Sequence, residues 1–109
     1  MKGMDFKEVK REVVQFTEDR NWDQFHTPEN LAKSISIEAA ELLECFQWNS
    51  EYDKEAVTEE LADVMNYCIL MADKIGVDIE DAIISKIRKN AAKYPVEKSY
   101  GSSKKYTEL

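Results

Sequence analysis

The scarcity of helix-breaking residues is the feature that most limits how this chain can fold. Only three Gly and two Pro occur among its 109 residues, and neither type occurs between Pro28 and Gly76. A sheet with tight hairpins needs such residues at its turns, whereas long helices exclude them. The sequence therefore predicts an all-α fold of long helices joined by short turns.

Hydrophobic spacing and end signals predict four helices. Their expected bounds are about residues 4–20, 27–48, 53–75 and 78–94. Thr27 is a suitable N-cap with Pro28 at the first helical position, and Gly76 and Pro95 are placed to end helices. A polar tail, residues 95–109, follows. The whole chain, 1–109, is expected to form a single domain, because it is too short for two.

Composition and charge narrow the possible partners. With 43% hydrophobic residues the chain can build a core, and its formal net charge of −7 argues against binding duplex nucleic acid. No apolar run approaches the roughly 20 residues of a membrane span, and the start, MKGMDFKEVK, lacks the apolar core of a signal peptide. Cys45 and Cys68 lack metal-ligand spacing and are expected to be thiols in a reducing cytosol. A cytoplasmic location follows as an expectation.

Two pairs of acids stand out because they lie in otherwise apolar helices. Glu38 and Glu41 are three residues apart, and Glu38 borders the apolar stripe of the second predicted helix. That stripe is expected to contain Ile35, Ala39, Leu42 and Phe46. Glu60 and Asp63 repeat the spacing on the third predicted helix, which is apolar around most of its circumference. We expect that helix to be buried on most sides, and Asp63 to have little access to water.

Two such pairs facing each other across a helical bundle would form a site for a hard cation. Carboxylate oxygens are the ligands of Mg²⁺ and Mn²⁺, and His26, the only histidine, lies outside both pairs, which disfavours iron. No basic residue lies three or four positions from any of these acids. The alternative is that both pairs lie on solvated helix faces and bind nothing.

The acid pairs occur within a wider set of motifs. EAAE at 38–41 and ELAD at 60–63 accompany RNWDQFHTPENL, SKIRKNAAKYP and a terminal KKYTEL. Together, over about residues 16–109, these motifs resemble the MazG-type all-α nucleoside triphosphate pyrophosphohydrolases, in particular their dCTP pyrophosphatase branch. The resemblance implies four-helix, bundle-like protomers that assemble into dimers or tetramers.

The resemblance also implies an activity and a set of site residues. The activity is Mg²⁺-dependent hydrolysis of a nucleoside triphosphate, dCTP or a modified dCTP, to the monophosphate and pyrophosphate, for nucleotide-pool cleaning or balance. Mn²⁺ is a possible substitute. The implied metal ligands and catalytic residues are Glu38, Glu41, Glu60 and Asp63. The implied substrate-binding residues are Trp22, Trp48 and Tyr67 around the base, and Lys86, Asn90 and Lys93 at the phosphates.

Several alternatives stay open at this point. The same fold could act on dUTP or another nucleoside triphosphate, or the chain could be a non-catalytic helical oligomer that binds nucleotide or protein. Lys86 and Lys93 could simply complement the dipole at a solvated helix end. The chain also departs from the branch near the expected base pocket, with Val13 in place of a polar residue and a shorter segment NSEYDKEAVT. The phosphate chemistry therefore follows more firmly from the resemblance than the preference for cytosine does.

Overall fold

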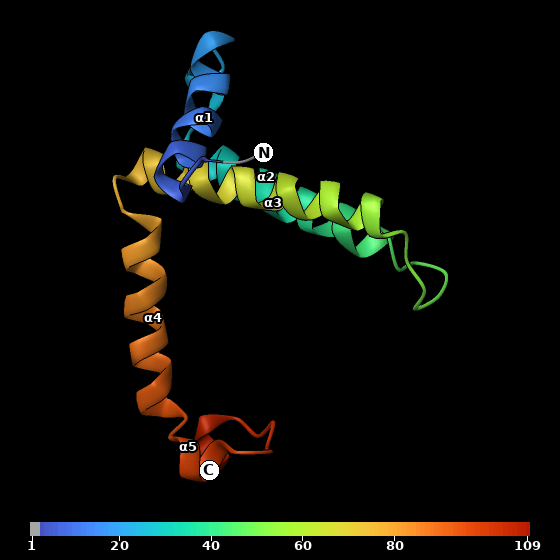
Figure 1. Ribbon diagram of the computed structural model, residues 1–109, viewed down its shortest axis with the longest axis vertical. Coiled ribbons are helices and arrows are strands. Elements are labelled where there is room, and N and C mark those ends of the chain that lie inside the picture. Colours follow the sequence, from blue (N-terminus) through green and yellow to red (C-terminus); the bar gives the residue numbers. More distant parts are fainter. Residues whose placement is uncertain (1–2) are drawn as a thin grey trace. The chain divides into compact units, whose positions relative to one another are not determined.

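The computed structural model describes residues 3–109, and these residues form helices and turns without a β-strand (Figure 1). The helices are α1 (Phe6–Asp19), α2 (Pro28–Glu44), α3 (Lys54–Ile75), α4 (Ile79–Lys93) and α5 (Val96–Ser99), with the 3₁₀ turns η1 (Asp23–Phe25) and η2 (Tyr106–Glu108). The prediction of an all-α fold is confirmed. No helix within residues 3–109 is both long and apolar enough to cross a bilayer.

The chain divides into two compact units, which are described separately. The first extends to Gly76 and contains α1, α2 and α3, and the second is Val77–Leu109. In the first unit α2 and α3 form an antiparallel pair, lying side by side along their length (Figure 1), and α1 packs against α3. The buried side chains of this unit are Thr17, Leu31, Ile69, Leu70 and Ala72.

Local signals begin the long helices close to the positions predicted from the sequence, and one of them ends α3 at the predicted glycine. The first helix has Asp5 as its N-cap, and the Asp5 Oδ1 accepts a 2.8 Å hydrogen bond from the Glu8 backbone N–H. The Thr27 hydroxyl accepts from the Asn30 N–H at 3.1 Å, with Pro28 at the first helical position. A cap of this kind stabilises a helix by about 1 kcal/mol. Gly76 ends α3 with φ 76°, a left-handed conformation that favours glycine.

The second predicted helix is shorter than expected, because α2 ends at Glu44 rather than at Trp48. Beyond Glu44 the backbone N–H groups of Cys45, Phe46 and Gln47 bond to carbonyls three residues back instead of four. The chain therefore leaves the α-helix in tight turns before it enters the loop.

The prediction that α3 is buried on most sides is wrong. Leu61, Met65 and Asp63 are all exposed, because the main helices that pack against α3 within this unit, α1 and α2, leave one side of it uncovered. The stripe predicted on α2 is likewise covered only in part. Ala39 and Phe46 are exposed, while Leu31, one turn before the predicted stripe, is fully buried.

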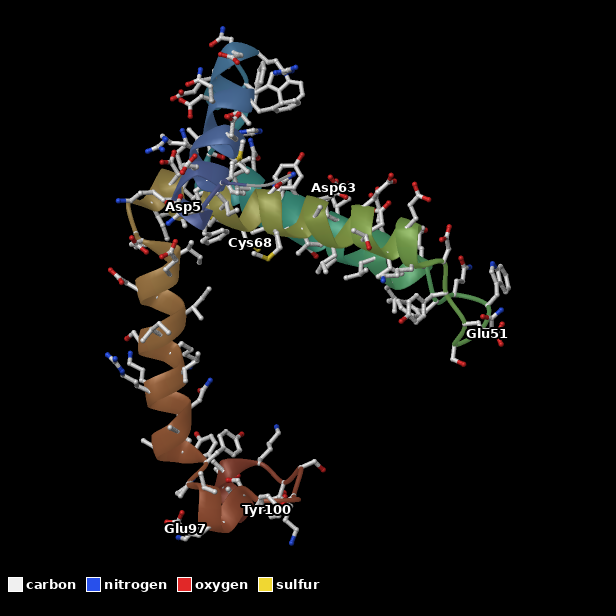
Figure 2. All side chains as sticks on the ribbon, viewed as in Figure 1. Asp5, Glu51, Asp63, Cys68, Glu97 and Tyr100 are labelled. Atoms are coloured by element: carbon white, nitrogen blue, oxygen red, sulfur yellow. The ribbon has the colours of Figure 1, made fainter. Side chains whose placement is uncertain are left out.

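The second unit consists of α4 and the folded tail. The fourth helix ends at Lys93, before Pro95, as predicted, and none of its side chains is buried. The Tyr106 ring meets Tyr94 edge-on with centroids 6.0 Å apart, and the Lys93 ammonium lies 4.8 Å from the centroid of the same ring. These contacts join the tail to the end of α4. Unlike Tyr106, whose ring contacts the end of α4, Tyr100 (labelled in Figure 2) is exposed to solvent.

Candidate metal centre and adjoining pocket

The antiparallel pairing of α2 and α3 brings the two acid pairs together. Glu38 and Glu41 lie one turn apart on α2, and Glu60 and Asp63 lie one turn apart on α3. Glu38, Glu60 and Asp63 each offer one carboxylate oxygen, and these three atoms lie within 4.8 Å of one another. In the view of Figure 2, Asp63 and Cys68 lie on opposite edges of the α2–α3 pair.

The two inner glutamates are poorly satisfied by the protein itself. Glu38 and Glu60 are half-buried, and the Oε2 atom of each is buried without a hydrogen-bond partner. The described ion pairs, Lys33–Glu29 and Lys74–Asp23, do not involve the cluster. Leaving a buried carboxylate oxygen without a partner costs free energy. The arrangement is therefore suited to a positive ligand between the two helices.

Hydrogen bonding, burial and charge repulsion within the cluster together raise the pKa values of Glu38 and Glu60. Hydrogen bonding to the Glu41 side chain, burial, and the negative charges of Glu41, Asp63 and Glu60 raise the pKa of Glu38 from 4.5 to about 7. Burial raises the pKa of Glu60 most, followed by the charge and hydrogen bonding of Glu41, then by the charges of Asp63 and Glu59. Glu41 is exposed, yet it is close enough to influence both inner glutamates.

The donor set fits a hard divalent cation. All three converging ligand atoms are carboxylate oxygens, and neither His26 nor the free thiols Cys45 and Cys68 belong to the group. Oxygen-only coordination of this kind suits Mg²⁺ or Mn²⁺ and does not suit zinc or iron–sulfur chemistry. The unpartnered Oε2 atoms of Glu38 and Glu60 would be available as two of the ligands of such an ion.

A pocket of about 910 Å³ adjoins the acid cluster and shares Asp63 with it. Its aromatic lining comes from Phe16, Trp22 and Tyr67, with the Phe16 and Trp22 rings in T-shaped contact at 5.7 Å between centroids. His26 meets Tyr67 edge-on at 6.3 Å. A pocket of this volume, largely apolar with a few polar groups, is typical of small-molecule sites.

The structure brings some of the predicted base-pocket residues together and leaves one out. Trp22 and Tyr67 line the same pocket as Asp63. Trp48 does not line it, and this side chain is 86% exposed. The second helix was expected to continue to residue 48, with Trp48 at its end. That assumption fails because α2 ends at Glu44.

The predicted phosphate-binding residues lie on α4, in the second unit. Lys86, Asn90 and Lys93 are exposed, and Lys93 lies over the Tyr106 ring. Two pocket residues, Glu12 on α1 and Asn66 on α3, were missed by sequence reasoning. Spacing offered a signal for Asn66, which is three residues after Asp63. Glu12 directly precedes Val13, the residue expected near the base pocket, and Val13 also lines the pocket.

Comparison with known proteins places the fold among nucleotide-processing relatives. Residues 33–109 match the MazG-like family. The dCTP pyrophosphatase 1 of Mus musculus is 38% identical over 113 residues, covering 94% of this chain and 66% of that protein. The Homo sapiens protein of the same name is 35% identical with the same coverages. A crystal structure of a pyrophosphatase from Archaeoglobus fulgidus has a TM-score of 0.76 and 38% identity, covering 87% of this chain and 96% of that chain.

The matched region contains the acid cluster but not the whole pocket. The matched range, residues 33–109, includes all four acids: Glu38, Glu41, Glu60 and Asp63. The pocket residue Trp22 lies before this range. The chain spans 66% of the length of the two mammalian relatives, just under two thirds. The family match extends over most of the chain, and the chain belongs to the MazG-like family.

Proposed function

We propose that this chain hydrolyses a nucleoside triphosphate to the monophosphate and pyrophosphate, with dCTP or a modified dCTP as the substrate. The observation that carries the proposal is the convergence of Glu38, Glu60 and Asp63, with two carboxylate oxygens buried and unpartnered. An acidic cluster by itself repels a triphosphate, so its use in catalysis requires a cation. The names of the mammalian and archaeal relatives support the same type of reaction.

Mg²⁺, with Mn²⁺ as a substitute, would be held by Glu38, Glu60 and Asp63, with Glu41 as the fourth acid. When bound, such an ion neutralises charge developing on the phosphates and acidifies water. Glu41 is exposed beside both half-buried glutamates, which positions it to accept a proton from the attacking water. The aromatic pocket that shares Asp63 is suited to the base, through Trp22 and Tyr67.

The basic residues of the second unit have a role in the same proposal. Lys86 and Asn90 are four residues apart on α4, so they share a face of that helix, and Lys93 follows on the next turn. We assign these side chains to the phosphate oxygens, which ammonium and amide N–H groups bind as donors. The activity is placed in the cytoplasm, where triphosphates are synthesised and where Cys45 and Cys68 stay reduced.

Self-association is part of the proposal because the single chain leaves much apolar surface uncovered. Only five of the described residues are buried. Large apolar side chains are exposed on α2 and α3, including Ile37, Leu43, Leu61 and Met65. Contiguous exposed apolar surface marks protein–protein contact sites. We propose a dimer or tetramer in which a second copy covers these side chains.

The experiment that tests the function measures pyrophosphate release from dCTP, dUTP and the four ribonucleotides with Mg²⁺. Asp63→Asn should reduce kcat at least about 100-fold while the circular dichroism spectrum stays helical, because a neutral amide is a weaker ligand than a carboxylate. Asp73→Asn, an exposed acid farther along α3, is the matched control and should retain activity. Unchanged turnover in Asp63→Asn would remove Asp63 from the catalytic site, and absence of pyrophosphate release from every substrate in the unmodified chain would support a non-catalytic binding protein. A tenfold preference for dUTP over dCTP would refute the assigned base.

A further inference from the structure

Besides Thr17, whose hydroxyl donates to the Val14 carbonyl, and His26, which meets Tyr67 edge-on, two polar side chains line the pocket without a role in the phosphate chemistry. Glu12 on α1 and Asn66 on α3 both line the pocket, and both are exposed. Neither side chain has a hydrogen bond or an ion pair with another residue in the described range 3–109. A carboxylate and an amide without partners, set among aromatic rings, are available to bind the polar edge of a ligand.

The surroundings of these two groups suit a planar, polar-edged ring. Aromatic surface comes from Phe16 on α1, from Trp22 just after α1, and from Tyr67 on α3. Aromatic walls hold a nucleobase by its faces, so selection between bases must come from groups that meet its edge. Glu12 and Asn66 come from different helices, and their relative position therefore depends on the packing of α1 on α3.

The pocket is connected to the acid cluster through one shared residue. Asp63 belongs both to the group of three converging carboxylates and to the pocket lining. Asn66 follows Asp63 by one helical turn and so lies on the same face of α3. A nucleotide with its triphosphate at the cluster could thus extend its base into the pocket.

The chemistry of the two side chains gives them different roles. An ionised carboxylate only accepts hydrogen bonds, and cytosine offers an amino group at C4. Uracil has a carbonyl oxygen at that position, and its ring N–H is flanked by two carbonyl oxygens, which repel a carboxylate. An amide both donates and accepts, so Asn66 can bind either base.

We propose that Glu12 and Asn66 bind the edge of the base, and that Glu12 makes the pocket select an amino-bearing pyrimidine, cytosine, over uracil. Asn66 adds affinity without selectivity. This assignment rests on the proposed function and specifies its substrate class. Although the lining residue Val13 is apolar, Glu12 and Asn66 still give the pocket polar groups that can meet the edge of a base.

The test compares kcat/KM for dCTP and dUTP in the unmodified chain, in Glu12→Gln and in Asn66→Leu. The unmodified chain should prefer dCTP. Glu12→Gln should lower the dCTP-to-dUTP ratio at least about 10-fold, because the glutamine amide can donate to the uracil carbonyl. Glu18→Gln, an exposed α1 residue outside the pocket, is the matched control and should leave the ratio unchanged. Asn66→Leu should lower both values to a similar extent.

A dCTP-to-dUTP ratio within twofold of the original in Glu12→Gln would overturn the assignment of Glu12. Calorimetric binding of dCMP and dUMP with Mg²⁺ provides a second readout that needs no turnover. Tighter binding of dCMP, lost in Glu12→Gln, would support base recognition even if no triphosphate were hydrolysed. Equal binding of the two monophosphates, or no binding of either, would refute it. Failure of the base assignment is thereby distinguished from failure of the proposed hydrolysis.

Discussion

The crowding of carboxylates predicts that the ion-free protein becomes less stable as the pH rises. Glu38 has a pKa raised from 4.5 to about 7, so between these values the folded chain binds a proton that the unfolded chain releases. The stabilising contribution is complete below about pH 4.5 and is lost as the pH rises through about 7. Carried by Glu38 alone, this shift would correspond to about 3 kcal/mol in the free energy of unfolding.

The expected effect is smaller than that value. Glu38 is only half-buried, so solvent screening reduces the loss of stability to about 1–2 kcal/mol. In a chain of this size such a loss lowers Tm by about 5–15 °C. Cation binding at high pH should restore the stability, because the ion takes the place of the proton.

Urea unfolding at pH 5 and pH 8, at one protein concentration, provides the assay. It is performed in EDTA and again in Mg²⁺, on the unmodified chain and on Glu38→Gln. The neutral glutamine should remove most of the pH-dependent difference seen in EDTA, and Mg²⁺ should stabilise the unmodified chain more at pH 8 than at pH 5. If the ion-free chain were equally stable at both values, or if Glu38→Gln kept the full pH dependence, the electrostatic argument would be refuted.

Three further predictions concern the helix end, the phosphates and self-association. Gly76→Ala should lower the free energy of unfolding by about 1 kcal/mol in urea titrations, because the cost of a side chain at φ 76° is not offset by any new contact. Lys86→Ala should raise KM for dCTP several-fold in pyrophosphate-release assays, and an unchanged KM would remove Lys86 from the phosphate site. Leu61→Lys should shift the mass measured by light scattering toward the monomer, because a charge at an apolar contact opposes association. The same mass in both proteins would show that Leu61 lies outside the interface.

Much of the candidate site could be anticipated because its acids follow a simple local rule. Spacing of three residues on each of two helices predicts two acid pairs, and the structure brings three of the four acids within 4.8 Å of one another. The burial of these acids was not predictable in the same way. Asp63 was expected to be enclosed by apolar residues, yet it is exposed, because an apolar helix circumference shows which surfaces could be covered and not which are covered.

The pocket was predictable only in part. Trp22 and Tyr67 do line it, whereas Trp48 lies in the loop after α2 and is exposed. Glu12 and Asn66 were not identified: Glu12 is one of three glutamates on α1 and has no distinctive pattern, and the three-residue spacing of Asn66 from Asp63 was the one signal available. Their common placement arises from the packing of α1 against α3, which brings together residues more than 50 positions apart in sequence.

The amino-acid sequence by itself determined the all-α class, the starts of the second to fourth long helices at Thr27, Asp53 and Asp78, and the end of α3 at Gly76. These features depend on caps, turns and periodicities that act within about four residues, so no distant contact is needed to specify them. Tertiary structure alone decided which carboxylate oxygens converge, which remain unpartnered, and which polar groups line the pocket. Those properties depend on how α1, α2 and α3 pack against one another, and the cost of crowding like charges arises only when that packing forms.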